Sequence, residues 1–320
     1  MAFPGTGSIW MNGTLVDWKD ATIHVASHIV HYGSGVFEGA RCYDTVNGPA
    51  CFRLDAHMRR LLDSARIYRM DSPYGEQALI DATVDLIRHN GFKACYIRPL
   101  IYRGYDSLGV NPLPCPIDVA ILLWEWPAYF TKEAIEEGID VKIATWARNA
   151  PNTTPAMAKS VANYANAQLI KLEAIADGYA EGIALDTQGN LSEGSGQNVF
   201  VVRDGIIYTP PIGNSVLSGI TRDSVIILAK DLGFEVREQT LPREMLYIAD
   251  EVFFVGTAVE VTPIKSVDRV TIGRGRRGPV TEALQQQFFR IVKGEAPDTH
   301  GWLLPVGSRE AAATGATKRR

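Results

Sequence analysis

Residues 155–168, PAMAKSVANYANAQ, carry a single charge, that of Lys159. Lysine is usually a solvated surface residue, but the neighbours of this one are Ala, Met, Ser and Val, and Tyr164 follows five residues later. Two interpretations fit these residue types. One is a helix face that lies in water, and the other is an amine held in a pocket for chemistry.

The composition is that of a soluble globular protein. The chain has 320 residues, 46% of them apolar and 21% charged, which is enough for about two domains. The net charge of −4 gives no electrostatic reason to expect nucleic acid or an anionic membrane as partner. Residues 1–13 lack the basic region and apolar run of a signal peptide, and no apolar run could span a bilayer. We therefore expect a cytoplasmic protein.

Cysteines and histidines do not form a metal-binding pattern. The four cysteines show no CxxC pair, so free thiols are expected. His24, His28 and His31 stand at helical spacing, but no carboxylate or cysteine joins them nearby, and no metal site is expected. The basic run GRGRR at 273–277 is interpreted as a solvated turn.

Apolar periodicity predicts an α+β fold with two sheets. The first half contains helices over 53–70 and 77–91 and a buried strand over 116–126. In the second half, a long helix is predicted to contain Lys159, and another opens after Gly219. The predicted division is a smaller N-terminal α+β domain at 1–125, a linker at 126–138, a larger C-terminal α+β domain carrying Lys159 at 139–306, and a frayed tail at 307–320.

Tyr96 and Arg98 in YIRPLIYRG fall on one face of a predicted strand, because side chains alternate along strands. A hydroxyl beside a guanidinium suits a carboxylate, to which arginine offers a bidentate fork. An exposed polar face of an edge strand explains the same spacing equally well.

LSGITRD, residues 217–223, precedes an apolar helical pattern. The free N–H groups of a helix N-terminus make an anion site, typically for phosphate, although ordinary capping by Thr221 or Ser218 is the alternative. Thr257, in the small-residue turn VGTAVE, is a candidate for a second anionic group.

Glu193 lies among small residues in NLSEGSGQNVF, where glycines let the backbone pass close to a flat group. Alone, it could be a plain loop carboxylate. Together, however, a lysine, a carboxylate, a phosphate-type helix terminus and a tyrosine–arginine pair are what a pyridoxal phosphate enzyme needs.

The sequence closely resembles the branched-chain amino acid aminotransferases, which are fold-type IV pyridoxal phosphate enzymes with a two-domain fold like that of D-amino acid aminotransferase. The resemblance covers almost the full chain except the tail. It rests on HYGSGVFEGARCYD, FRLDAHMRRLLDSA, YIRPLIYRG, LGVNP, APNTTPAMAKSVANY, EGIALDTQGNLSEGSGQNVF, LSGITRD and VFFVGTAVEVTPIKSVD. The resemblance implies an α+β fold with the active site between the two domains.

The resemblance also implies a role for each site residue. Lys159 would form the Schiff base and carry the proton, Glu193 would pair with the pyridine nitrogen, and Tyr164 would hydrogen-bond the phenolic oxygen. The phosphate would be bound by Arg59, Ile220, Thr221 and Thr257, with further cofactor contacts at Gly196, Asn198, Leu217, Gly219 and Gly256. The implied substrate contacts are Tyr96, Thr257 and Ala258 for the α-carboxylate, Arg98 for the side-chain carboxylate of glutamate or 2-oxoglutarate, and Phe37, Gly39, Trp126, Tyr129 and Tyr164 for the apolar pocket. Tyr32 and Val110 would reach in from a neighbouring subunit, so a homodimer is the expected minimal active unit, with assembly into hexamers left open.

The implied reaction is ping-pong transamination of L-leucine, L-isoleucine and L-valine with 2-oxoglutarate, giving branched-chain 2-oxo acids and L-glutamate. It would end the synthesis of these amino acids or begin their degradation. The sequence departs from the family pattern at Gln197, where many members have Glu, and at 160–163, which replaces a glycine-containing stretch. The CxxC redox pair of some animal members is also absent.

Two alternatives remain. One is a related transaminase that accepts aromatic amino acids or (R)-amines. The other is a non-catalytic protein that binds pyridoxal phosphate or a carboxylate. The complete set of Lys159, Glu193, Tyr164 and Arg59 argues against the second alternative.

Overall fold

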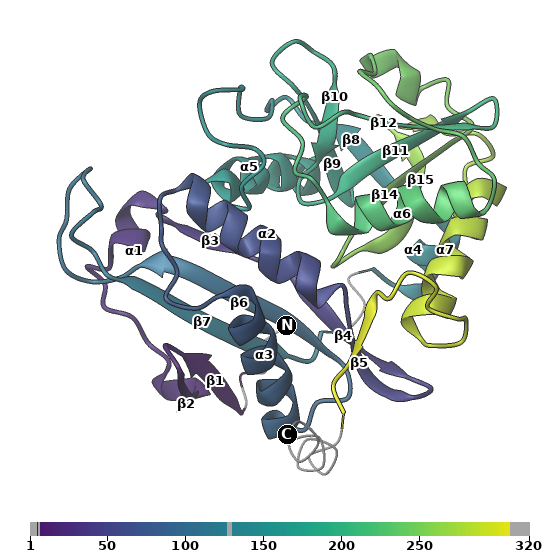
Figure 1. Ribbon diagram of the computed structural model, residues 1–320. Helices are drawn as coiled ribbons and strands as arrows, with labels where there is room; N and C mark the ends of the chain where they lie inside the picture. The colour runs from purple at the N-terminus through teal and green to yellow at the C-terminus, as the bar shows by residue number, and fades with distance from the viewer. Residues whose placement is uncertain (1–4, 6, 127–129, 308–320) are drawn as a thin grey trace. The chain divides into compact units, whose positions relative to one another are not determined.

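The computed structural model describes residues 5, 7–126 and 130–307 (Figure 1). The chain divides into two compact units, unit 1 and unit 2. Unit 1 consists of Met1–Pro127, Ala158–Val161 and Arg290–Arg320, and unit 2 of Ala128–Met157 and Ala162–Phe289. The segment carrying Lys159 and the chain from Arg290 onward cluster with unit 1, although the predicted division places them in the C-terminal domain and the tail, and the predicted linker at 126–138 is divided between the two units. Residues 308–320 of the expected tail lie outside the described residues.

Unit 1 is built on an antiparallel sheet. Its strand order is β17-β5-β4-β6-β7-β1-β2, and β3 also pairs with β6. The strands are β1 (Ser8–Met11), β2 (Thr14–Asp17), β3 (Gly35–Phe37), β4 (Ala40–Thr45), β5 (Gly48–Phe52), β6 (Cys95–Arg103), β7 (Ile117–Trp124) and β17 (Leu303–Pro305). The helices are η1 (Trp18–Asp20), α1 (His28–Tyr32), α2 (Leu54–Ile67) and α3 (Glu76–Asn90).

The helix α2 shows why this core forms. Leu54, Met58, Leu61 and Ala65 recur along one side of the helix, and all four are buried in one cluster with Ile97 of β6. The structure thus confirms the helix predicted over 53–70.

The helix predicted over 77–91 is α3, and its C-cap is Gly91, the last residue of the predicted range. Gly91 adopts a left-handed φ of 72°. The hairpin turn between β1 and β2 is formed by Asn12 and Gly13, and both residues have the positive φ that such a turn requires.

Unit 2 contains the second predicted sheet. Its strand order is β10-β9-β8-β15-β14-β11-β12-β13, with β16 paired to β15. The strands are β8 (Ile139–Ile143), β9 (Glu181–Leu185), β10 (Leu191–Gly194), β11 (Asn198–Arg203), β12 (Ile206–Thr209), β13 (Val236–Glu238), β14 (Glu251–Gly256), β15 (Glu260–Val267) and β16 (Val270–Thr271). The helices are α4 (Lys132–Glu137), α5 (Asn163–Ala176), α6 (Ile220–Asp231), η2 (Arg243–Leu246) and α7 (Pro279–Val292), of which the last turn, from Arg290, belongs to unit 1.

One predicted element is wrong. Lys159 does not lie in a helix, because α5 begins only at Asn163. The residues before it run alongside β3 instead, where the Phe37 N–H donates to the Lys159 carbonyl at 3.0 Å and the Val161 N–H donates to the Gly35 carbonyl at 2.9 Å. These hydrogen bonds replace the helical ones that the alanine-rich sequence favours.

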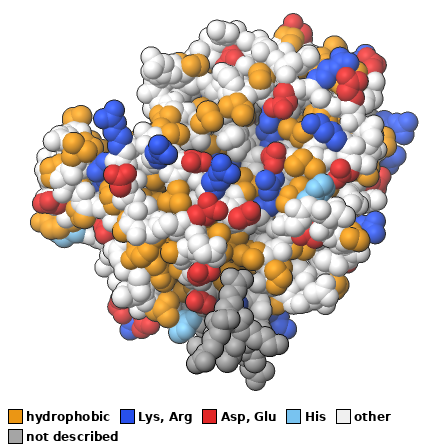
Figure 2. Space-filling view, in the orientation of Figure 1, with side chains coloured by type: hydrophobic (Ala, Val, Ile, Leu, Met, Phe, Trp, Pro, Cys, Tyr) orange, Lys and Arg blue, Asp and Glu red, His pale blue; other side chains and the backbone are white. Residues whose placement is uncertain are grey.

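The surface carries charges of both signs, and the cysteines are free thiols. On the face shown in Figure 2, basic and acidic side chains are interspersed, with apolar side chains scattered between them. All four cysteines are free and buried, as expected: Cys42, Cys51, Cys95 and Cys115. Within the described ranges, no helix has both the length and the apolar character needed to cross a membrane.

Candidate active site

Lys159 is fixed to unit 1 by its backbone. Its N–H donates to the Ser64 Oγ on α2 at 3.1 Å, and its carbonyl accepts from Phe37 as described above. The next residue, Ser160, forms an isolated antiparallel bridge with Val36. The Lys159 Nζ lies 5.0 Å from the centroid of the Phe37 ring. The main-chain bonds on both sides fix the position of the backbone from which the Lys159 amine extends.

Arg98 lies against the same aromatic ring. Its guanidinium carbon is 4.7 Å from the Phe37 centroid, 5.4 Å from that of Tyr96 and 5.5 Å from that of Trp124. The Arg98 Nε is buried without a hydrogen-bond partner, and no described carboxylate forms an ion pair with this side chain. An arginine stacked on aromatic rings and lacking an acidic partner can receive a carboxylate.

Tyr96 and Arg98 share one face of β6, as the alternation predicts. The alternative of an exposed edge strand is wrong, because β6 lies between β4 and β7 and Tyr96 is only 5% exposed. The Tyr96 ring packs 4.3 Å from the Trp126 ring, measured between centroids. A Cβ on Gly39 would lie 1.9 Å from the Tyr96 hydroxyl, so only glycine leaves room for it. Tyr129 falls outside the described residues.

Glu38, which directly precedes Gly39, forms a buried charge cluster with His57 and Arg60 of α2. Glu38 accepts from the Nε of Arg60 at 2.6 Å and forms a 2.7 Å contact with the Nδ1 of His57. Burial raises the pKa of the Glu38 carboxyl, but the Arg60 charge and the His57 bond outweigh burial and hold this pKa well below its usual range. Burial lowers the pKa of His57. Arg59, by contrast, is exposed, and it makes no hydrogen bond or ion pair with the described part of the chain.

In unit 2, the Glu193 carboxylate at the end of β10 is buried and held by three groups. The Nη2 of Arg148 lies 2.9 Å from its Oε1, and the Nδ2 of Asn198 and the backbone N–H of Leu217 each donate to its Oε2 at 3.1 Å. Glu193 is only 5% exposed, so it is not a plain loop carboxylate. A buried carboxylate with a charged partner and two further donors is fixed in position and remains compensated.

The N-terminus of α6 lies beside Glu193. The side chain of Asn198 also donates to the Leu217 carbonyl, at 3.0 Å. A Cβ on Gly219 would lie 1.9 Å from the Asn198 Oδ1, which explains the glycine just before the helix. Ile220 and Thr221 open the helix and are both buried. The structure therefore brings Glu193, the asparagine and the helix terminus together.

The glycine-rich turns of unit 2 meet on adjacent strands. Asn198 pairs with Val255 between β11 and β14, and a Cβ on Gly256 would lie 3.7 Å from the Gly196 carbonyl oxygen. Thr257 and Ala258 follow in the turn between β14 and β15. The predicted cofactor-binding residues in these turns therefore lie near Asn198, which binds Glu193.

Gln197 contacts the buried acid Glu181. Its Nε2 donates at 3.0 Å to Glu181, which is fully buried and paired with Lys171. Its Oε1 accepts from the Gly196 N–H. The residue that replaces the Glu of many family members at this position therefore donates a hydrogen bond to the Glu181 carboxylate.

Three more of the expected residues are Tyr164 in unit 2 and Tyr32 and Val110 in unit 1. Tyr164 is half-buried in the first turn of α5 in unit 2. Tyr32 is 45% exposed at the end of α1, and Val110 is 89% exposed in the loop after β6. This exposure leaves both side chains accessible to another molecule.

Sequence reasoning missed three features: Arg148 beside Glu193 in unit 2 and, in unit 1, Trp124 and the group of Glu38, His57 and Arg60. Arg148 follows β8 in the chain, and its role can be inferred only once its partner Glu193 is known. Trp124 is directly opposite Tyr96 in the β6–β7 ladder. Its role could be inferred only from that register.

Comparisons with known proteins identify the family. Residues 35–267 match the model of the class IV amino-transferases. The branched-chain-amino-acid aminotransferase of Salmonella typhimurium is 52% identical over 301 residues, covering 94% of this chain and 97% of the relative. That of Pseudomonas aeruginosa is 45% identical, with 94% and 97% covered.

Solved structures agree as well. The Escherichia coli branched-chain amino acid aminotransferase superposes with a TM-score of 0.93 at 51% identity, covering 94% of this chain and all of the other. The enzyme from Thermobaculum terrenum, solved in its PLP-form, gives a TM-score of 0.88 at 34% identity, covering 95% and 99%. The chain therefore belongs to the class IV aminotransferase family and is a transaminase of the α+β, fold-type IV kind that the sequence predicted.

Proposed function

We propose that this aminotransferase moves the amino group of L-leucine, L-isoleucine and L-valine to 2-oxoglutarate, with pyridoxal phosphate as cofactor. One observation carries the proposal, namely that the Lys159 amine and the Arg98 guanidinium lie against the same Phe37 ring. An amine, a cation with no acidic partner among the described residues and an apolar ring suit amino acids that are apolar or end in a carboxylate. The names of the relatives support the same substrates. Such a reaction ends the synthesis of branched-chain amino acids or begins their degradation.

The residues fit pyridoxal phosphate in their donor chemistry. Glu193 is a buried carboxylate held in place, as a partner for a protonated ring nitrogen requires. The N-terminus of α6, with Ile220 and Thr221, suits a phosphate, and Thr257 would add a hydroxyl. When bound, the cofactor supplies an electron sink for the α-carbon of the substrate.

Each side chain then has a defined task. The Lys159 Nζ takes the α-proton of the substrate and later returns a proton, so that one amine acts as base and then as acid. Glu193, fixed by Arg148, holds a proton at the pyridine nitrogen. Tyr164 donates its hydroxyl hydrogen to the phenolic oxygen. Asn198 and the Leu217 N–H keep the Glu193 carboxylate oriented.

Arg59 is proposed to bind the cofactor phosphate, and the structure adds its neighbour Arg60 as a second candidate because that side chain points inward to Glu38. The variants Arg59→Gln and Arg60→Gln separate the two residues. Retention of the cofactor after dialysis is the measurement. The proposal predicts loss from Arg59→Gln, whereas loss from Arg60→Gln alone would transfer the role to Arg60.

The aromatic setting of Arg98 explains how one pocket accepts two kinds of side chain. Apolar chains contact the rings of Phe37 and Trp126, while the carboxylate of 2-oxoglutarate reaches Arg98. Arg98→Leu should therefore slow the 2-oxoglutarate half-reaction by tens-fold, the equivalent of roughly 2 kcal/mol for a charge-assisted contact. The half-reaction with L-isoleucine should be spared. Equal loss in both half-reactions contradicts this role.

The assembly is proposed to be a homodimer at least, with Tyr32 and Val110 of one subunit completing the substrate pocket of its partner. The exposure of both residues supports this arrangement. Further association into hexamers is compatible with it.

The absorbance spectrum of the purified protein tests the function directly. We expect a visible band from bound cofactor that disappears on addition of L-isoleucine and returns with 2-oxoglutarate. Lys159→Ala is the control, since it should retain cofactor but transfer no amino group. A band that responds to L-phenylalanine or (R)-1-phenylethylamine but not to L-isoleucine would replace the substrate assignment. No band after addition of pyridoxal phosphate would refute the cofactor.

A further inference from the structure

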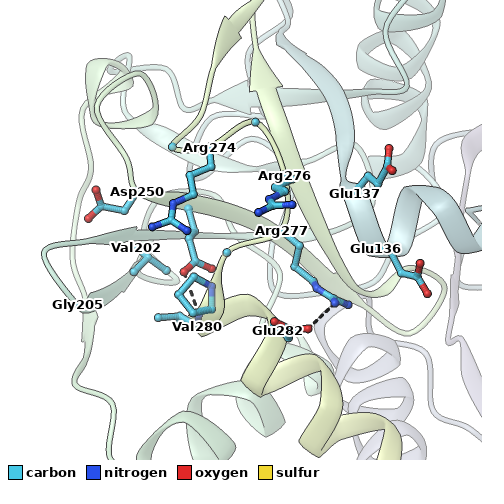
Figure 3. Close-up of a pocket in the computed structure, with 15 residues that line it drawn as sticks. Glu136, Glu137, Val202, Gly205, Asp250, Arg274, Arg276, Arg277, Val280 and Glu282 are labelled. Carbon is cyan, nitrogen blue, oxygen red and sulfur yellow. Dashed lines mark hydrogen bonds and ion pairs between the residues drawn. The ribbon is translucent and has the colours of Figure 1, made fainter.

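The basic loop Gly273–Gly278 is more than the solvated turn that its sequence predicts. It connects β16 with α7 and forms part of the lining of a pocket of about 970 Å³ in unit 2 (Figure 3). Pockets that bind small molecules usually measure roughly 300–1,000 Å³. The space is therefore sufficient for an organic molecule. None of the residues assigned to transamination lines it.

Glycines fix the course of this loop. Gly273 has a φ of +51°, and a Cβ there would lie 2.1 Å from the Asp250 carbonyl oxygen. A Cβ on Gly278 would lie 2.1 Å from the Glu251 carboxyl carbon. Side chains are thus excluded at both ends, and the arginines between them are carried on a backbone with a defined path.

The three arginines of the loop differ in their contacts. Arg277 donates to Gln285 at 2.5 Å and to Glu282 at 2.6 Å, and Figure 3 shows it turned toward Glu282. Arg274 and Arg276 lie on the other side of the loop in the same view, and both are exposed. Neither forms a hydrogen bond or ion pair with any described residue. Two guanidinium groups therefore line the pocket without a partner from the described part of the chain.

Most carboxylates around the pocket are already engaged elsewhere. Glu251 is buried and accepts from the Val280 and Thr281 N–H groups at the start of α7, at 2.9 and 2.7 Å. Asp250 accepts from the Asp204 N–H at 2.7 Å, and Glu282 is bound by Arg277.

On α4, Glu136 lies 3.8 Å from Lys132, which leaves Glu137 as an exposed acid in the lining. The positive charges of Arg274 and Arg276 are thus not cancelled by a direct partner among the described residues. Guanidinium groups bind phosphate through planar, bidentate hydrogen bonds.

We propose that this pocket binds a small phosphate-bearing molecule, with Arg274 and Arg276 contacting the phosphate oxygens. None of the residues assigned to the cofactor lines this pocket, so the holoenzyme would bind the phosphate-bearing molecule in addition to its cofactor. Because both arginines are exposed, solvent screens the contacts and the binding depends on ionic strength.

Equilibrium dialysis of the holoenzyme with pyrophosphate as the probe, at constant ionic strength, tests the proposal. The double variant Arg274→Gln/Arg276→Gln is compared with Arg237→Gln, an exposed arginine on β13 that pairs with Glu235 outside the pocket. We expect one pyrophosphate per chain in the unmodified protein and in the control. Binding should be roughly tenfold weaker in the double variant, the loss expected for two screened charge-assisted contacts.

Three results with pyrophosphate, and a fourth with citrate, would overturn the proposal. The three with pyrophosphate are no binding to the unmodified holoenzyme, equal binding to the double variant, and equal loss in the Arg237→Gln control. Citrate serves as a second probe of the same charge class. If citrate binds as tightly as pyrophosphate, the pocket does not select phosphate and the assigned ligand class is wrong.

Discussion

Gly39 leaves no room for a side chain, since a Cβ on the glycine would lie 1.9 Å from the Tyr96 hydroxyl oxygen. The Tyr96 ring is packed between its neighbours and has little freedom to retreat, with the Trp124 centroid at 5.0 Å and the Trp126 centroid at 4.3 Å. Insertion of a methyl group into such a packed place typically costs about 1–3 kcal/mol.

Gly39→Ala should therefore displace Tyr96 and weaken substrate binding. We expect KM for L-isoleucine to rise roughly tenfold, with the visible band of the bound cofactor unchanged. Steady-state kinetics and the absorbance spectrum measure the two effects. Gly75→Ala is the matched control, because no heavy atom lies within 4 Å of a Cβ at that position. An unchanged KM in Gly39→Ala would show that Tyr96 does not touch the substrate.

Glu38 links stability to pH. Its pKa is held well below the ordinary value of about 4.3, so the native state releases this proton more readily than the unfolded chain. The resulting stabilisation is fully present above about pH 4.3 and is lost as the pH falls toward the native pKa. His57, whose pKa is lowered by burial, acts in the same direction, and its contribution begins to fall below about pH 6.5.

We expect the free energy of unfolding to decline between about pH 5 and pH 3.5 more steeply in the unmodified protein than in Glu38→Gln. The variant should also be less stable at neutral pH by about 3 kcal/mol, because Arg60 loses its partner in a buried pair. Chemical denaturation at several pH values gives both quantities. Asp63→Asn, on the exposed side of α2, should leave the pH dependence unchanged. If the free energy of unfolding falls equally steeply with decreasing pH in Glu38→Gln and in the unmodified protein, Glu38 does not link stability to pH.

At the scale of elements, local signals explain much of the fold. The apolar spacing of α2, the glycine that ends α3 and the glycine before α6 were sufficient to place three helices. The alternation in β6 was sufficient to place Tyr96 and Arg98 together. The segment around Lys159 was not predictable in this way, because its alanines favour helix while its hydrogen bonds go to β3. A partner more than a hundred residues away leaves no trace in the local pattern.

The pairing of 158–161 with β3 should matter for catalysis, because it positions Lys159. Val161→Pro removes the N–H that donates to the Gly35 carbonyl. Val161→Ala keeps this bond and serves as the control. We expect transaminase activity of Val161→Pro to fall by roughly a hundredfold, the effect of a displacement of about 1 Å at a reacting group.

Activity and thermal unfolding of both variants are the measurements. A full-activity Val161→Pro protein would show that the strand-like pairing does not position the lysine.

At the scale of the whole molecule, sequence alone did not reveal which apolar residues stay uncovered. Two segments of unit 1 are tied together, since the His28 Nε2 contacts the Gly109 carbonyl at 2.9 Å and the His24 and Tyr105 rings lie 4.4 Å apart. We call their exposed apolar side chains the unit 1 patch: Val25, Val30, Tyr32, Tyr105, Leu108, Val110 and Leu113. Exposed apolar groups of this kind mark interaction surfaces.

The unit 1 patch gives the proposed dimer a physical basis, because association would remove it from water. A charge within it should oppose association, since a carboxylate buried without a partner is strongly unfavourable. Val110→Asp, at a position 89% exposed, should therefore be folded but monomeric at concentrations where the unmodified protein is dimeric. Its activity should fall as well, because Val110 is proposed to reach the partner's pocket. Val46→Asp, at a position 67% exposed in the turn between β4 and β5, is the control and should remain dimeric and active. Sedimentation velocity and the transamination assay give the two readouts. An active monomer, in either the unmodified protein or Val110→Asp, would show that each chain carries a complete substrate pocket.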